Sequence, residues 1–160
     1  MSKVLVTYYS WSGNTKKVAE ALAQQIGADL VALTVPLDTF SKDMYETNDQ
    51  ANEQLAKNRL PELSNFPENL AAYDTIFIGG PVWSGKPATP LLKFFELLPN
   101  KPIRVVPFYT SAGQSEEYEE NFKKTLKSNL LVANGFEVRS NELDKQQIKQ
   151  IITTFIKKMN

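Results

Sequence analysis

The feature that most constrains the fold of this 160-residue chain is a fivefold alternation of strand-like and helix-like segments. The strand-like segments are short apolar runs rich in β-branched and aromatic residues, a pattern typical of strands buried on both faces of a sheet. They span residues 4–9, 29–35, 75–78, 103–109 and 136–139. Because helices separate them, the sequence predicts an α/β fold, a doubly wound parallel sheet with helices on both faces.

The segments between these strands carry apolar residues at helical spacing. The predicted helices span residues 18–26, 90–98, 118–130 and 148–159. In the long polar stretch between residues 37 and 73, Met44, Ala51 and Leu55 form a sparser stripe, which predicts a further helix ending near Arg59. At about 150 residues per domain, the length predicts that residues 1–160 form a single domain.

The composition excludes several kinds of chemistry, because the chain has no cysteine and no histidine. Disulfides, thiolate nucleophiles, cysteine-ligated metal centres and histidine acid–base catalysis each need one of these residues. We therefore expect no catalytic side chain and no metal site, and we expect a bound cofactor to supply the difficult chemistry.

The charge balance and the lack of long apolar runs limit the partners. The 18 basic and 18 acidic residues cancel, which argues against a nucleic-acid partner. No apolar run approaches the roughly 18 residues of a membrane-spanning helix. The start, Met1-Ser2-Lys3 followed at once by a predicted strand, lacks the length of a secretory signal, so a cytoplasmic location is expected.

The first loop, residues 10–15, follows the first predicted strand and leads into a helix. Parallel α/β sheets bind ligands beyond the carboxyl ends of their strands, and backbone N–H groups at a helix N-terminus attract anions. The hydroxyls of Ser10, Ser12 and Thr15 add hydrogen-bond donors, and Gly13 lets the backbone approach a ligand closely. The loop predicts a phosphate site, although the same residue types also form ordinary helix caps.

The spacing within the first loop excludes common alternatives. It has neither the Gly-x-x-x-x-Gly-Lys-Ser/Thr pattern of nucleotide hydrolases nor the three spaced glycines of the Rossmann fingerprint. A phosphate-accepting receiver module needs acidic residues at the end of the first strand, where this chain has Tyr8, Tyr9 and Ser10.

The second loop, residues 81–86, and the third loop, residues 110–114, follow the next two central strands. Trp83 lies among turn-forming residues, which favours contact of its ring with a planar ligand; the alternative is a ring folded back onto the rim of the sheet. Trp11 is a second candidate for ring contact. A phosphate loop, an aromatic residue flanked by glycines and a polar turn at one edge together fit a mononucleotide with a flat heterocycle.

The segment from Tyr9 to Thr15 resembles the phosphate loop of the flavodoxin family, a Ser/Thr-x-Thr-Gly-x-Thr pattern in which Ser12 replaces the middle threonine. Residues 80–85 and 110–113 resemble the second and third loops of that family, and the similarity covers essentially the whole chain. The resemblance implies a five-stranded sheet in the order 2-1-3-4-5, with FMN at the point where the winding direction reverses.

By position, the resemblance assigns FMN binding to all three loops, with the phosphate on the first loop and the isoalloxazine between the second and third. The predicted cofactor-binding residues are Ser10, Trp11, Ser12, Gly13, Asn14, Thr15, Pro81, Val82, Trp83, Ser84, Gly85, Lys86, Thr110, Ser111, Ala112, Gly113 and Gln114.

The resemblance implies an FMN-binding redox protein that exchanges electrons with a partner protein or a small-molecule donor or acceptor, with no nucleic-acid or membrane partner. The balanced charge departs from the acidic composition typical of electron-carrier flavodoxins. Two alternatives stay open. One is an NAD(P)H-dependent FMN or quinone reductase, similar to the tryptophan-repressor-binding-protein branch of the superfamily. The other is a non-redox module in which flavin is a structural or sensory group.

Overall fold

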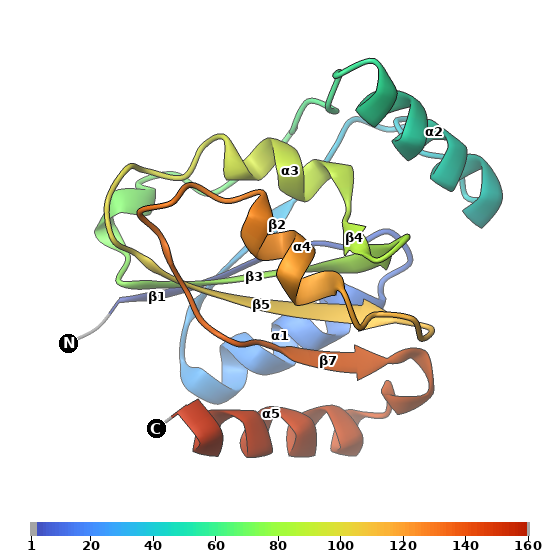
Figure 1. The fold of residues 1–160 in the computed structure, drawn as a ribbon. Helices are drawn as coiled ribbons and strands as arrows, with labels where there is room; N and C mark the ends of the chain where they lie inside the picture. The colour runs from blue at the N-terminus through green and yellow to red at the C-terminus, as the bar shows by residue number, and fades with distance from the viewer. Residues whose placement is uncertain (1–2, 160) are drawn as a thin grey trace.

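The computed structural model describes residues 3–159; Met1, Ser2 and Asn160, which the predicted domain includes, lie outside the described residues. Strands and helices alternate along the chain as the sequence predicts (Figure 1). The strands are β1 (Val4–Tyr9), β2 (Asp29–Leu33), β3 (Thr75–Trp83), β4 (Lys86–Pro87), β5 (Arg104–Ser111), β6 (Leu131–Val132) and β7 (Phe136–Arg139). The helices are α1 (Asn14–Ile26), α2 (Met44–Ala56), α3 (Thr89–Phe95), α4 (Tyr118–Lys124) and α5 (Lys145–Met159), with short 3₁₀ helices η1 (Leu70–Ala72) and η2 (Ser140–Glu142).

The sheet has the strand order β2-β1-β3-β5, and β6 and β7 both pair in parallel with β5. The predicted fold class, a parallel sheet between helices, is confirmed. The expectation of five strands is wrong in detail, because the part of the chain that the structure describes forms a seven-stranded sheet. The additional strands are β4, an antiparallel hairpin partner of β3, and β6, which shares the last position of the sheet with β7.

Pro107 and Gly135 explain why the last position is divided between two strands. The start of β5 pairs with β6 and its end pairs with β7, so the interruption lies opposite Pro107. Proline has no N–H to donate to a ladder of hydrogen bonds. The backbones also approach closely at this point, because a Cβ added to Gly135 would lie 1.7 Å from the carbonyl oxygen of Pro107.

Different helices cover the two faces of the sheet, α1 and α5 on one and α3 and α4 on the other (Figure 1). In β1, Leu5 and Tyr9 belong to the core cluster that includes α3 and α4, whereas Val6 and Tyr8 belong to the cluster of α1 and α5. Successive side chains of a strand point to opposite faces. The nearly continuous apolar run in β1 therefore fills both cores, as predicted for a central strand.

The ends of the helices match the sequence predictions unevenly. Helix α1 ends at the predicted Gly27, which has a φ of 68° and donates its N–H to the carbonyl of Ala23. Helix α4 ends at Lys124, well before the predicted Leu130. Beyond it, both the N–H and the hydroxyl of Thr125 bond to the carbonyl of Phe122, at 3.3 and 2.8 Å, a tighter turn that does not continue the α-helix.

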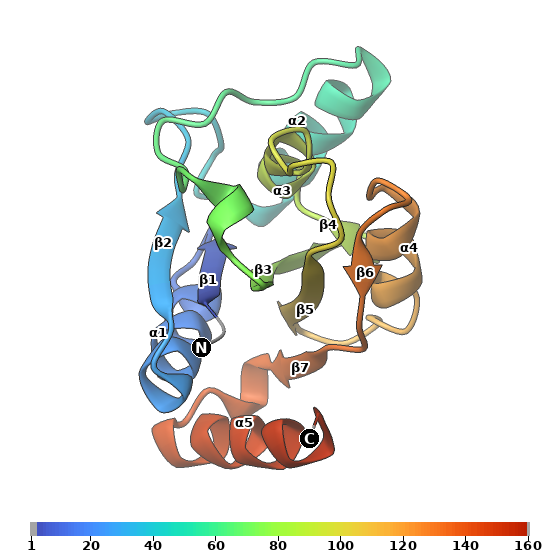
Figure 2. The same ribbon diagram turned by 90° about the vertical axis from the view of Figure 1, so that its left-hand side faces the viewer.

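Helix α2 was predicted from a sparse apolar stripe, and it lies at the outside of the fold next to α3 (Figures 1 and 2). Its buried side chains are Thr47 and Ala51, whereas Met44 and Leu55 are 64% and 42% exposed. The stripe therefore identified the helix and, through Ala51, part of the face by which it docks, but it missed Thr47 on that face. None of the helices within residues 3–159 is long and apolar enough to cross a membrane.

Candidate functional site

The three predicted loops lie at one edge of the sheet, because β1, β3 and β5 are parallel neighbours and end on the same side. Two contacts join the loops or their strands. The hydroxyls of Thr15 and Thr110 are 2.8 Å apart and buried, which links the first loop to the third. The ring centroids of Tyr9 and Trp83 are 5.9 Å apart, which links the end of β1 to the end of β3.

The first loop caps the N-terminus of α1 only in part. Gly13, the residue before the helix, has a left-handed φ of 95° and no side chain that could cap the helix. Instead, the Oγ of Ser10 accepts hydrogen bonds from the backbone N–H groups of Gly13 and Lys16, at 3.0 and 3.2 Å. Both lone pairs of that oxygen are thus used, and its proton is available for a ligand. Ser12 is exposed and Asn14 is half-buried beside it.

Trp11 does not stand free in solvent. Its indole N–H donates to the carbonyl of Ser41 at 3.0 Å, and its ring packs partly buried against the core cluster of α3 and α4. Ser41 also accepts a bond from the hydroxyl of Thr47 at 2.8 Å through the same carbonyl. The first loop is therefore connected to the segment that leads into α2.

The second loop is a tight hairpin, which corrects the expectation that Trp83 lies in a turn. Trp83 is the last residue of β3, and Ser84 and Gly85, with φ of 52° and 74°, form the two-residue connection to β4. Two positive φ values are what the favoured short hairpin turn requires. The half-buried Trp83 ring packs edge-on against Tyr9 and, at 5.1 Å, against Phe40.

Helix α2 contributes to this edge of the sheet, which the sequence did not indicate. The hydroxyl of Ser84 donates to Asn48 at 3.1 Å, and the hydroxyl of Thr89 donates to Gln54 at 2.6 Å. A pocket of about 270 Å³ lies between α2 and the first two loops, and one of about 350 Å³ is lined by α2, the second loop, α3 and α4. Residues from both loops and from α2 line the first pocket: Trp11, Met44, Tyr45, Thr47, Asn48, Val82, Trp83 and Ser84.

The other residues of the second loop differ in exposure. Lys86 is exposed and lines the larger pocket, whereas Pro81 and Val82 are half-buried in β3. The carbonyl of Gly85 accepts a hydrogen bond from the side-chain amide of Asn121 in α4, at 2.9 Å. The hairpin is thus held from both sides, by α2 and by α4.

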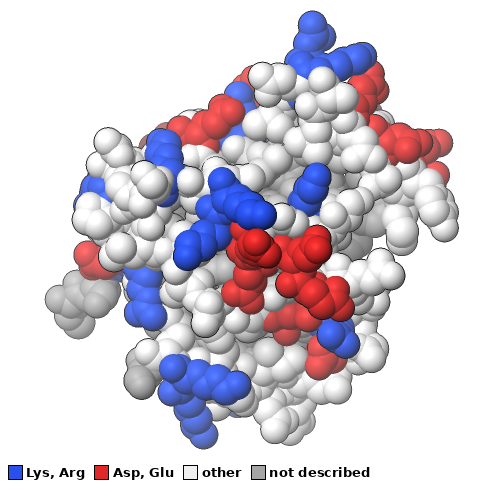
Figure 3. Space-filling view, viewed as in Figure 1, with Lys and Arg blue, Asp and Glu red and all other residues white. Residues whose placement is uncertain are grey.

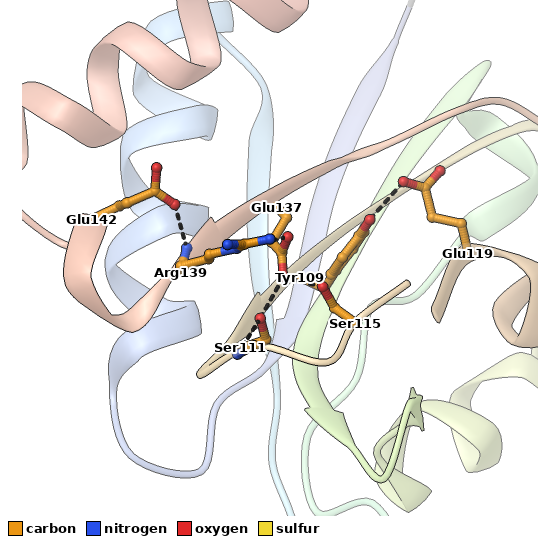
Figure 4. A network of polar contacts seen from close by, with 8 residues as sticks. Tyr109, Ser111, Ser115, Glu119, Glu137, Arg139 and Glu142 are labelled. Carbon is orange, nitrogen blue, oxygen red and sulfur yellow. Dashed lines mark hydrogen bonds and ion pairs between the residues drawn. The ribbon is translucent and has the colours of Figure 1, made fainter. Parts of the chain in front are cut away.

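The third loop begins inside β5, since Thr110 and Ser111 are its last residues. Gly113 and Gln114 follow with positive φ values of 126° and 58°, and Ala112 and Gln114 are exposed. The hydroxyls of Ser111 and Ser115 both donate to one carboxylate oxygen of Glu137 in β7 (Figure 4). Sequence reasoning missed Glu137, which has no partner nearby in the chain other than Arg139.

Glu137 is ionised at neutral pH. Burial opposes its ionisation, but the hydrogen bonds from Ser111 and Ser115 and the charge of Arg139 outweigh burial and hold the pKa of the carboxyl below its usual value. The guanidinium Nε of Arg139 lies 3.5 Å from the other carboxylate oxygen.

A second carboxylate, that of Glu119 in α4, supports β5 on the other side of the third loop (Figure 4). It accepts the hydroxyl of Tyr109 at 2.7 Å and the N–H of Gly135 at 2.8 Å. Burial and this carboxylate raise the pKa of Tyr109 well above its usual range, so Tyr109 is a neutral donor.

The surface around the site is mixed in charge. The face seen in Figure 3 carries both signs, with acidic side chains gathered toward its middle and right and basic side chains beside and around them. Among residues 3–159, no group of three His, Cys, Asp or Glu side chains is placed to hold a metal ion.

This sheet order, with a partly capped helix N-terminus after the first strand and two further loops beside it, defines a flavodoxin-like α/β protein. The chain belongs to the flavodoxin family, which it matches over residues 3–155. It is similar to a flavoprotein from Lactobacillus acidophilus, crystallised in complex with FMN, with 34% identity, a TM-score of 0.80 and coverage of 94% of this chain and 99% of the other. Oxidised flavodoxin 2 from Bacillus cereus shares the fold, with 20% identity, a TM-score of 0.57 and coverage of 98% of this chain and 99% of the other.

Curated relatives match part of the chain. A protein named NAD(P)H dehydrogenase (quinone) from Gluconacetobacter diazotrophicus is 33% identical over 99 residues, covering 60% of this chain and 46% of the relative. A protein of the same name from Archaeoglobus fulgidus is 29% identical over 103 residues, covering 61% of this chain and 51% of the relative. The matches thus span about half the length of these relatives.

Proposed function

We propose that this protein binds FMN at the three loops and functions as a redox protein that carries electrons through the flavin. The N-terminus of α1 carries the proposal: Gly13 is left-handed and has no side chain to cap the helix, and the Ser10 hydroxyl braces the loop through the N–H groups of Gly13 and Lys16. Helix N-termini of this kind bind phosphate because unpaired N–H groups and the helix dipole both favour an anion. The full-length similarity to an FMN complex supports the same ligand.

The donors present fit a phosphate. The proton of Ser10 is available because its oxygen already accepts two backbone N–H groups. The hydroxyl of Thr15 is 1% exposed and shares a hydrogen bond with Thr110; if Thr110 donates that bond, the proton of Thr15 remains for the phosphate. Ser12 and Asn14 complete the predicted phosphate-binding residues, and Gly13 lets the backbone approach the phosphate closely.

The second and third loops are proposed to hold the isoalloxazine, a flat ring that accepts and releases electrons when bound. Residues 81–86 and 110–114 contribute backbone groups and one large aromatic side chain, and none of them needs to act as an acid or a base. Trp83 is the favoured ring contact, because it ends the strand between β1 and β5, whereas the indole of Trp11 is tied to Ser41.

Separate Trp11→Ala and Trp83→Ala variants test this assignment. Stacking on an aromatic side chain contributes about 1–3 kcal/mol per base, so Trp83→Ala should weaken FMN binding about tenfold or more. We expect Trp11→Ala to have a smaller effect in the same titration. A larger loss of FMN affinity in Trp11→Ala would mean that Trp11, in the first loop, contacts the ring. Unchanged affinity in both variants would mean that neither tryptophan stacks on the flavin.

The experiment that tests the function begins with an absorption spectrum of protein purified without added cofactor. The apoprotein is then titrated in parallel with FMN and with riboflavin, which lacks the phosphate. Charge-assisted hydrogen bonds contribute about 1.5–3 kcal/mol each, so FMN should bind at least about tenfold more tightly than riboflavin. Failure of FMN to copurify or bind would overturn the function, and equal affinity for both flavins would overturn the phosphate site.

The second candidate is an NAD(P)H-dependent quinone reductase, favoured by the names of the curated relatives. Anaerobic mixing of the FMN-loaded protein with NADPH separates the two candidates. Rapid bleaching of the flavin by NADPH alone would favour the reductase, and bleaching only through an added electron-transfer partner would favour the carrier. If no physiological reductant cycles the bound flavin between its redox states, a structural or sensory role would be favoured.

The partners are proposed to be electron donors and acceptors, either a protein or a small molecule. Residues 1–160 are proposed to act as one FMN-binding domain, and the cytoplasmic location expected from the sequence stays a prediction.

A further inference from the structure

The third loop has little to hold it in shape by itself. Ala112 and Gln114 are exposed, and Gln114 has a left-handed φ of 58°, which is unfavourable for a residue with a side chain. Such a conformation persists only where the surrounding structure supports it. The support must therefore come from the ends of the loop.

Both ends of the loop bond to the same atom. Ser111, near the start, and Ser115, directly after the loop, donate their hydroxyls to Oε2 of Glu137 (Figure 4). The Oγ of Ser111 also accepts the backbone N–H of Gly113 at 3.2 Å. A continuous chain of hydrogen bonds thus runs from the backbone of Gly113 through Ser111 to the carboxylate, and each bond in such a chain strengthens its neighbour.

Glu137 is itself held in place. Its strand β7 pairs with the end of β5, where Tyr109 lies opposite Glu137 and Ser111 opposite Arg139. Its neighbours Phe136 and Val138 are 7% and 0% exposed, so their burial fixes which face of the strand Glu137 occupies. Arg139 holds the second carboxylate oxygen.

We propose that Glu137 is a positioning residue that closes the third loop into the shape the flavin site requires. The inference rests on the proposed function, since it assigns to the loop a ligand that the first loop anchors. A loop fixed before binding presents its backbone groups without a further loss of conformational freedom, and this lowers the cost of binding the ring. The role is indirect, because Glu137 acts through Ser111 and Ser115.

Four variants test the proposal. Glu137→Ala removes the acceptor, and Glu137→Gln keeps an acceptor oxygen but removes the charge. The double variant Ser111→Ala/Ser115→Ala removes the donors and leaves Glu137 in place, so it covers the case in which Glu137→Ala does not fold. Glu142→Gln is the matched control, because Glu142 accepts only the backbone N–H of Arg139, at 2.9 Å, and is not bonded to the loop.

The first readout is amide hydrogen exchange at Gly113 and Gln114 in the protein without flavin. Glu137→Ala should accelerate exchange there about tenfold and leave the centre of β5 unchanged. Glu137→Gln should have a smaller effect and Glu142→Gln none. Acceleration spread equally over β5 and β7, or an equal effect of Glu142→Gln, would show that Glu137 serves the fold in general and would overturn the proposal.

The second readout is the dissociation constant of FMN, measured at equal fractions of folded protein. Glu137→Ala should raise it about tenfold. Adding Ser115→Ala to Glu137→Ala should cause little further change, because both substitutions remove the same bond between the Ser115 hydroxyl and the carboxylate. Additive effects, or an unchanged dissociation constant in Glu137→Ala, would overturn the proposal. If the unmodified protein does not bind FMN, the proposed function fails, and the exchange data still decide whether Glu137 closes the loop.

Discussion

Helices α1 and α2 have the same length, 13 residues, but are stabilised in opposite ways. Helix α1 buries five side chains and begins after Gly13, which has no side chain to cap it, so that only the Ser10 hydroxyl from the first loop holds an N–H group of its first turn, that of Lys16. Helix α2 buries two side chains and caps its own N-terminus, because Asp43 accepts the N–H of Tyr45 at 3.4 Å. Polar contacts to Ser84 and Thr89 attach it to the rest of the molecule.

This difference indicates which of the two helices can bind a ligand at its N-terminus. Unpaired N–H groups at a helix start are unfavourable unless something satisfies them. Helix α1 tolerates a partly capped start because the core holds it, so the rest of its first turn remains for a phosphate. Helix α2 has no comparable support from packing, and its own side chain satisfies its first turn.

The largest expected effect comes from a substitution in α1, the helix that is packed into the core. Leu22 of α1 is fully buried, so Leu22→Ala should lower the free energy of unfolding by about 2–5 kcal/mol. Leu55 of α2 is 42% exposed, and Leu55→Ala should cost less than about 1 kcal/mol. Urea denaturation of both variants measures the contrast. Equal losses would mean that α2 is as firmly packed as α1.

An intermediate effect is expected at the two ends of α1. Gly13 and Gly27 both have positive φ, and a Cβ on either would meet nothing within 4 Å. Replacing either by alanine should therefore cost about 1 kcal/mol of stability through the backbone alone. Only Gly13→Ala should also weaken FMN binding, by about tenfold, in a titration against Gly27→Ala. Equal affinities in the two variants would argue against a phosphate at the start of α1.

The smallest effect is expected at the cap of α2. Asp43→Ala should cost about 0.5–1 kcal/mol, but only in the local opening of α2, since this helix contributes little to the core. Amide exchange should accelerate a few-fold in its first turn and remain unchanged in α1. Glu46→Gln, in the same turn but outside the cap, is the control. A matching acceleration in α1 would show that the two helices open together.

The sequence predicts the region from β1 to α1 better than it predicts α2. Apolar periodicity and turn-forming residues identify β1, the first loop and α1, because each of these signals is local. The stripe of α2 identifies a helix, yet Thr47 is 3% exposed while Met44 is 64% exposed. The buried hydroxyl of Thr47 donates a hydrogen bond to the carbonyl of Ser41. Apolar periodicity does not detect a polar residue that is buried in this way.

Two features of the site depend on tertiary contacts or local turn geometry. The residues around Trp83 indicate a turn, and a turn of only Ser84 and Gly85 lets β3 continue through Trp83. Glu137 looks like any exposed strand glutamate, because its partners Ser111 and Ser115 lie on a distant loop. Only the pairing of β7 with β5 brings them together.

The divided last strand has a further consequence, for the protein at high concentration. A sheet edge with a long row of unpaired backbone groups is a template on which another chain can add a strand. Here that edge consists of β6 and β7, two and four residues long, interrupted beside Pro107 and Gly135. An incoming strand finds no continuous row of hydrogen-bond partners on this side, so the same interruption that divides the strand also protects this edge of the sheet against edge-to-edge aggregation.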